Sequence, residues 1–188
     1  MLVALSGLGA GVLGSRLLRA LPRGADVRWP WCAAPTAALW SAAALVSPPR
    51  WLPVPLLLAW LGVLLAAADL RCGRLPDALT LPAYPAVAVA LWSAGADPGR
   101  ALGGCLVFLA AHLAVRRLRR SALGGGDVKL SGALGAVLGA VSWQALPVAA
   151  AVASAITLVV AVRWPADGLP HGPGLVGATW LTSVWGPW

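Results

Sequence analysis

The sequence consists of long apolar runs separated by short clusters of charge. Seven stretches contain no Asp, Glu, Lys or Arg: 1–15, 29–49, 51–68, 78–96, 101–115, 130–162 and 168–188. Most of them approach the roughly 20 apolar residues with which an α-helix crosses a bilayer. The longest run, 130–162, exceeds one crossing, and Ser142-Trp143-Gln144 followed by Pro147 predicts a turn in its middle. The pattern predicts an all-α, polytopic transmembrane bundle of about eight short spans.

Composition excludes two broad classes of protein. The chain is 60% hydrophobic and 11% charged, whereas a soluble domain carries roughly a quarter of charged residues. This rules out a soluble globular protein. The net charge of +8 raises the possibility of nucleic-acid binding, but such binding needs a soluble face on which Lys and Arg cluster. No such face can be drawn, so we expect no nucleic-acid partner.

The basic residues predict how the chain is oriented. Short cytoplasmic loops of membrane proteins collect Lys and Arg. With the N-terminus outside and eight crossings, 12 of the 14 basic residues fall on the cytoplasmic side, and only Arg50 and Arg100 fall outside. All six acidic residues are Asp, and the same topology places five of them in the cytoplasm and only Asp97, in a solvated loop, outside. This asymmetry of the acids is not part of the positive-inside rule, so it calls for a local reason.

Two aspartates lie at cytoplasmic helix ends. Asp69 ends the third expected span, and Asp127 follows Gly124-Gly125-Gly126 and opens the sixth. A helix N-terminus favours an acid, which gives Asp127 an ordinary role as a cap, but the helix dipole disfavours an anion at the position of Asp69. If the two ends meet in the bundle, like-charge repulsion makes the pair hold a single proton. One Asp can then activate water while the other polarises a carbonyl, as in aspartic proteases.

Two blocks of sequence contain these aspartates. They are Asp69-Leu70-Arg71-Cys72-Gly73-Arg74-Leu75-Pro76-Asp77-Ala78-Leu79-Thr80 and Gly124-Gly125-Gly126-Asp127-Val128-Lys129-Leu130. In this order and on one face, they resemble the signature blocks of the bacterial type IV prepilin leader peptidases, which are membrane aspartic peptidases of the GxGD class. The segment Pro170-His171-Gly172-Pro173-Gly174-Leu175 is similar to the family's Gly-Pro segment before its last helix.

The resemblance implies a function and a set of site residues. Asp69 and Asp127 would be the catalytic pair, and Gly124 and Gly126 the two glycines of GxGD. The expected activity is removal of the short basic leader of a prepilin or pseudopilin, just ahead of its hydrophobic helix, at the cytoplasmic face of the bacterial inner membrane. The expected partners are therefore that substrate and the lipid bilayer, and no metal or other cofactor is expected. Pro76, Gly172 and Pro173 would support the site or contact the substrate.

Two charged residues near the pair have alternative interpretations. Asp77 is placed to attract a basic leader, but Leu75-Pro76-Asp77 is also typical of a turn with Asp as the N-cap of the fourth span. Lys129 could act electrostatically on Asp127, or it could reach from the helix start to the lipid headgroups. The sequence leaves both alternatives open.

The first 50 residues follow the family pattern loosely. Residues 14–22 are similar to its first block, with Arg16 where an aromatic residue is usual and Leu18 where Asn is usual. Many members then carry a four-cysteine zinc domain associated with N-methylation of the product. Here only Cys32 remains, in a loop of about ten residues, so neither zinc binding nor methyltransferase activity is expected. We expect residues 1–50 to form two spans and residues 51–188 to form a six-span peptidase core.

Two other functions compete with a peptidase. A small transporter or proton-coupled channel would use intramembrane Asp residues to carry ions. The aspartates sit at helix ends on one face, however, and form no ladder through the midplane. A catalytically degenerate family member that assists pilus assembly is the other alternative.

Overall fold

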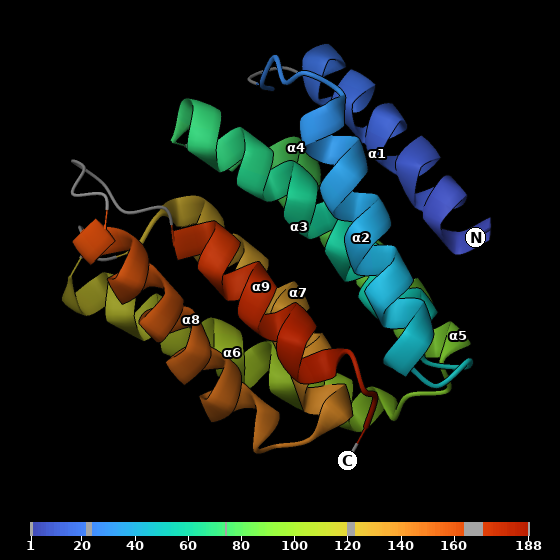
Figure 1. Ribbon diagram of the computed structural model, residues 1–188. Coiled ribbons are helices and arrows are strands. Elements are labelled where there is room, and N and C mark those ends of the chain that lie inside the picture. The colour runs from blue at the N-terminus through green and yellow to red at the C-terminus, as the bar shows by residue number, and fades with distance from the viewer. Residues whose placement is uncertain (1, 22–23, 74, 120–122, 164–170, 188) are drawn as a thin grey trace.

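The chain is a bundle of helices. The computed structural model describes residues 2–21, 24–73, 75–119, 123–163 and 171–187, and within these ranges there are nine helices and no strand. Figure 1 shows α1 and α2 at one edge of the bundle and α6 and α8 at the other, with α3 and α9 between them. The expected all-α class is confirmed. The helices are α1 (Leu2–Ala20), α2 (Pro30–Val46), α3 (Pro53–Cys72), α4 (Asp77–Thr80), α5 (Ala83–Ser93), α6 (Pro98–Leu118), α7 (Gly125–Val141), α8 (Ala145–Arg163) and α9 (His171–Ser183).

The long apolar run 130–162 is divided where the sequence predicts a turn. Helix α7 ends at Val141 and α8 begins at Ala145. The hydroxyl of Ser142 accepts a hydrogen bond from the Ala145 N–H at 3.1 Å, which satisfies one of the free donors at the start of α8. The run therefore forms two helices.

The fourth expected span, residues 78–96, is not one helix. It forms the single turn α4 and the 11-residue helix α5, which is only about 16 Å long and too short to cross the hydrocarbon core unaided. The break falls at Leu81-Pro82, because Pro82 has no N–H to donate to the preceding turn, although both residues keep right-handed helical backbone angles.

The outer surface of the bundle is suited to lipid. Among the described residues, α1, α3 and α6 are long and apolar enough to cross a membrane, and α2 and residues 145–160 are shorter apolar helices. Large apolar side chains point outward from several of them: Leu2, Leu45, Leu106, Leu118 and Val162 are each more than half exposed. An aqueous surface would make such exposure unfavourable. The protein is a multi-pass membrane protein.

Glycines allow α6 and α7 to approach at the backbone. A Cβ atom on Gly104 would lie 2.6 Å from the Gly139 Cα, and one on Gly139 would lie 2.7 Å from the Gly104 Cα. At the end of the contact, Arg100 donates from Nη2 to the Val141 carbonyl at 3.1 Å. Small residues permit this close packing between membrane helices, where dispersion replaces the hydrophobic effect as the main attraction. The start of α6 is thereby packed closely against the end of α7.

Tryptophans connect helix α3 and the segment before it to their neighbours. The indole N–H groups of four Trp side chains donate to main-chain carbonyls of other segments. These bonds, of 2.7–3.0 Å, run from Trp40 to Leu56, from Trp60 to Ala10, from Trp180 to Pro55 and from Trp51 to Ser183. These bonds satisfy the indole N–H groups of Trp40, Trp60 and Trp180, all of which are partly buried. Helices α1 and α2 pack on each other and on α3, while the division at residue 50 stays a prediction.

The glycine contact gives a test of the bundle. Gly139→Ala is expected to lower the free energy of unfolding by about 1–3 kcal/mol, because the new methyl group meets the α6 backbone. Gly177→Ala, in α9, is the matched control, since a Cβ there meets no atom within 4 Å. Denaturant titration in detergent micelles measures both. Equal stability of the two variants would show that α6 and α7 do not pack through these glycines.

Candidate active site

Asp69 and Asp127 meet at one end of the bundle. Asp69 is in the last turn of α3, and Asp127 is in the first turn of α7. Helices α5 and α9 each pack against both α3 and α7, and so hold these two ends beside each other (Figure 1). The charge of Asp127 acts on the Asp69 carboxyl group. The packing thus brings together two carboxyl groups that are 58 positions apart in the sequence.

Asp69 lies where the chain leaves the helix. Gly73 follows α3 with φ 60°, in the left-handed conformation that glycine adopts easily, and its N–H donates to the main-chain carbonyl of Asp69 at 2.7 Å. The Asp69 side chain is partly exposed. It therefore stands at the C-terminal end of a helix, where the helix dipole disfavours a negative charge.

Asp127 is more buried and is bonded at the start of its own helix. Only 7% of the residue is exposed, and its Oδ2 accepts a hydrogen bond from the Gly124 N–H at 3.3 Å. Asp127 thus caps α7 from the third helical position, while Gly124 occupies the N-cap position itself. Burial of Asp127 disfavours its charged form, and the helix N-terminus and the Gly124 N–H oppose that effect.

The glycines near the pair allow close contact between chain segments. A Cβ atom on Gly126 would lie 2.7 Å from the Leu75 Cβ, and one on Gly172 would lie 3.0 Å from the Asp127 Oδ1. Gly124 donates the N–H that Asp127 accepts. Three of the expected glycine positions are therefore in the site, and Gly172 brings the start of α9 to it.

The two prolines expected at the site, Pro76 and Pro173, differ in position. Pro76 is buried and occupies the N-cap position of α4, directly after Leu75. Pro173 instead lines a cavity between α3 and α9 together with Gly62 and Val176. Pro76 therefore shapes the segment that covers Gly126, while Pro173 positions α9 against α3.

Asp77 and Lys129 form an ion pair with each other. The distance from Nζ to Oδ1 is 2.8 Å, and both side chains are about half exposed. The N-cap alternative for Asp77 is wrong, because Pro76 takes that position and no side chain caps α4. Lys129 reaches Asp77 at the start of α4, and its main-chain carbonyl accepts a hydrogen bond from the Tyr84 hydroxyl at 2.6 Å.

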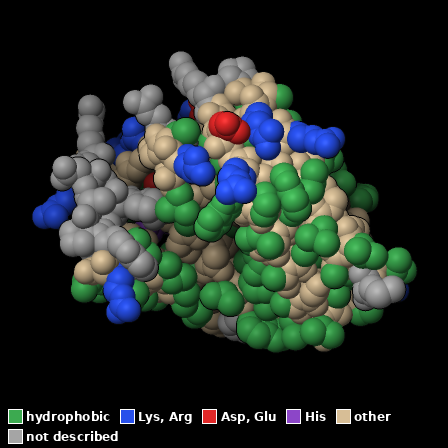
Figure 2. All heavy atoms as spheres, turned by 45° about the horizontal axis from the view of Figure 1, so that its top comes forward, with side chains coloured by type: hydrophobic (Ala, Val, Ile, Leu, Met, Phe, Trp, Pro, Cys, Tyr) green, Lys and Arg blue, Asp and Glu red, His purple; other side chains and the backbone are tan. Residues whose placement is uncertain are grey.

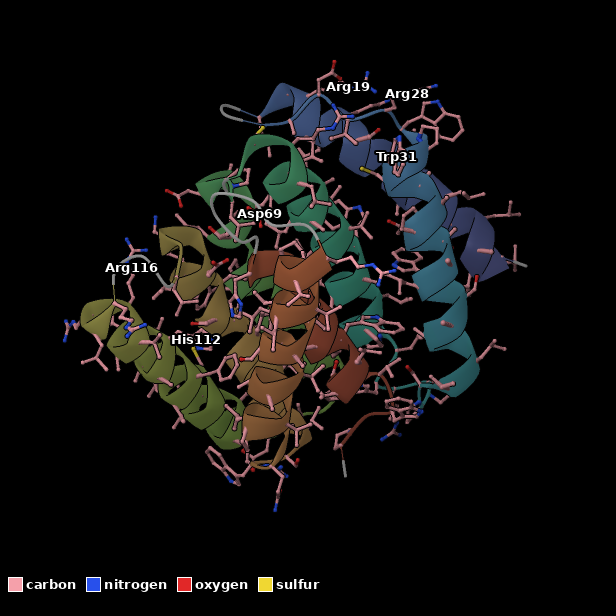
Figure 3. All side chains as sticks on the ribbon, turned by 60° about the vertical axis from the view of Figure 1, so that its left-hand side comes forward. Arg19, Arg28, Trp31, Asp69, His112 and Arg116 are labelled. Atoms are coloured by element: carbon pink, nitrogen blue, oxygen red, sulfur yellow. The ribbon has the colours of Figure 1, made fainter. Side chains whose placement is uncertain are left out.

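Arg116 also lies at this site, a position that no sequence pattern indicates. Its guanidinium group lies over Gly125, where a Cβ atom would be 2.7 Å from Nη1, and its charge acts on Asp127. Figure 3 shows Arg116 at the end of α6 and Asp69 at the end of α3. In the sequence Arg116 is one of four arginines after an apolar run and resembles a stop-transfer cluster. Only packing distinguishes it from Arg117 and Arg119.

Other expectations about charged and thiol residues need correction. Cys32 is buried in the first turn of α2 and not in a loop. Asp97 is the N-cap of α6, accepting from the N–H groups of Gly99 and Arg100, and is not simply a solvated loop acid. Asp26 pairs with Arg19 at 3.2 Å. Asp167 and Pro170 lie outside the described residues.

Comparison with known proteins identifies the family. The family model described as "Type IV leader peptidase family" matches residues 56–162. A protein named "Prepilin leader peptidase/N-methyltransferase" from Aeromonas hydrophila is 33% identical over 182 residues, covering 86% of this chain and 59% of its own length. The protein of the same name from Burkholderia pseudomallei (strain 1026b) is 36% identical over 135 residues, covering 65% of this chain and 43% of its own length.

The chain thus spans about three fifths of the length of the relative from Aeromonas hydrophila. No solved structure matches the chain significantly. The matched region runs from α3 to α8 and includes both Asp69 and Asp127. On the extent of this match and on the identity to these relatives, the chain belongs to the type IV leader peptidase family.

Proposed function

We propose that this protein is a membrane aspartic endopeptidase that removes the short basic leader from type IV prepilins or prepilin-like proteins. The observation that carries the proposal is the placement of Asp69 and Asp127 at the same end of the bundle, near enough for the charge of one to act on the other. Relatives named prepilin leader peptidases supply the substrate class. Their names also include N-methyltransferase, an activity that we do not extend to this chain.

The proposed chemistry uses the two carboxyl groups as a unit. With one proton between them, the ionised carboxylate takes a proton from water, and the oxygen of that water attacks the carbonyl carbon of the scissile peptide. The protonated carboxyl group donates to the carbonyl oxygen. The proton taken from water then moves to the amide nitrogen as the C–N bond breaks, and the hydroxyl proton returns to the second Asp. Atoms and protons balance without a metal or other cofactor.

The proposed location of the reaction is the cytoplasmic face of the bacterial inner membrane. Figure 2 shows Lys and Arg side chains grouped around an acidic side chain at the end of the bundle that is at the top of Figure 1, with apolar side chains beyond them. Arg71 is in the last turn of α3 and Arg116 is in the last turn of α6. Arg50 precedes the start of α3, and Arg100 is near the start of α6, so both are at the opposite ends of these helices. An excess of basic residues marks the cytoplasmic side of membrane proteins.

The ion pair of Asp77 and Lys129 suggests how a basic leader is received. Asp77 is half exposed and Lys129 already neutralises it. A Lys or Arg of the leader would replace Lys129 as the partner of Asp77. In this proposal the pair attracts the leader to the end of the bundle at which Asp69 and Asp127 meet.

Loss of either aspartate tests the catalytic pair. Asp69→Asn and Asp127→Asn are each expected to lower the rate of leader removal at least about 100-fold, because neither amide exchanges a proton with water or substrate. The measurement is the ratio of uncleaved to cleaved prepilin in membranes that contain both proteins. Asp26→Asn is the matched control, because Asp26 is 90% exposed and pairs with Arg19. Normal processing by either Asn variant would show that the pair is not catalytic.

The proposed contact between Asp77 and a basic leader predicts opposite changes of KM in two variants. Asp77→Asn is expected to raise the KM for a basic leader about two- to fivefold, and Lys129→Gln to lower it by a similar factor, since exposed ion pairs contribute about 0.2–1 kcal/mol. A substrate whose leader has Gln in place of its basic residues should respond to neither change. Shifts of KM in the same direction for both variants would contradict competition between Lys129 and the leader.

A further inference from the structure

The guanidinium group of Arg116 is placed for an interaction inside the site. It extends from the last turn of α6 onto the first residue of α7, with Cζ and Nη2 each 3.3 Å from where a Gly125 Cβ would be. Its Nη1 is buried and has no hydrogen-bond partner among the described residues. Burying a guanidinium nitrogen without a partner is costly, so its position calls for an electrostatic or substrate partner.

Asp127 supplies the electrostatic partner. The charge of Arg116 acts on this carboxylate, and the Gly124 N–H donates to it. The Asp69 side chain accepts no hydrogen bond within the described part of the chain. Asp69 also lies at the end of a helix and not at its start. The two aspartates therefore differ in nearby charge, in hydrogen bonding and in their position on a helix.

The other charged and titratable side chains of the described helices near Asp127 bond to groups other than Asp127. On α7 itself, Lys129 is bound to Asp77 of α4. On α6 and α9, His112 and His171 line a cavity of about 340 Å³, where His112 Nδ1 is bonded to the Phe108 carbonyl and His171 Nδ1 to the Thr157 hydroxyl. On α5, Tyr84 donates to a main-chain carbonyl, and on α3, Arg71 donates to the Asp26 carbonyl.

We propose that Arg116 is a positioning residue that keeps Asp127 ionised, so that the single proton of the pair resides on Asp69. This inference rests on the proposed function and assigns a different role to each aspartate. Asp127 then takes the proton from water, and Asp69 donates to the carbonyl oxygen of the scissile peptide. Arg116 acts through Asp127 and does not itself contact the reacting atoms.

The dependence of kcat/KM on pH tests this role. Cleavage requires ionised Asp127, so activity rises with pH along the acidic limb of the profile. Arg⁺ favours the ionised form, and Arg116→Gln is expected to move that limb to higher pH by roughly one unit, which is an about tenfold loss of kcat/KM below the limb. The basic limb, which reports the proton on Asp69, should move less. Arg116→Lys keeps the positive charge, so its acidic limb should lie close to that of the unmodified protein.

Arg117→Gln is the matched control, because Arg117 is the next residue of α6 and is exposed. Its profile should coincide with that of the unmodified protein. An Arg116→Gln profile with an unchanged acidic limb overturns the role of Arg116. The Asn variants of Asp69 and Asp127 test the proposed function separately, so an unchanged limb alongside inactive Asn variants would overturn only this inference.

A second variant keeps the test independent of the folding of Arg116→Gln. Gly125→Ala places a methyl group within 2.7 Å of Nη1 and must displace the flexible guanidinium group. It leaves the charge in the protein but moves it away from Asp127. We expect the acidic limb to move in the same direction as in Arg116→Gln, by a smaller amount. A shift to lower pH would contradict the proposal.

Discussion

A carboxylate in a membrane bundle loses hydration, and each aspartate of the described chain has neighbours that offset that loss to a different degree. Asp26 and Asp77 remain exposed and pair with Arg19 and Lys129. Asp97 accepts main-chain N–H groups at the start of α6. Asp127 has the Gly124 N–H, the start of α7 and the nearby Arg116. Asp69 lacks comparable support, and this makes it the member of the pair better suited to carry a proton.

The position of that pair depends on how closely the helix backbones approach. Gly104 and Gly139 let α6 and α7 make contact through main-chain atoms, and at the other end of this helix pair Arg116 lies over Gly125. Gly126 and Gly172 let the Leu75 segment and α9 close around Asp127. A side chain at any of these positions would force neighbouring atoms to shift, and small displacements of catalytic groups are costly for proton transfer.

The site also extends beyond the region that defines the family. Residues 56–162 contain both aspartates, Arg116 and the pair of Asp77 with Lys129. Gly172 lies after this region. A Cβ atom there would be 3.0 Å from Oδ1 of Asp127, so this glycine keeps α9 close to the carboxyl group. Helix α9 also connects the two halves of the site, because it packs against α3 and α7. The last helix is therefore part of the proposed catalytic architecture.

The sequence by itself determined the helical class, the turn at Ser142 and the placement of Asp69 and Asp127 at helix ends, because hydropathy, turn residues and charge are local properties of the chain. Resemblance to a family then pointed to the two aspartates as partners. Local properties also misled: the run 78–96 has the length of a span, but Pro82 divides it. They could not identify the partner of Asp77 or distinguish Arg116 from its neighbours, since both depend on which helices pack side by side. Only the tertiary structure decided those contacts, because lateral packing joins residues that hydropathy along the chain does not relate.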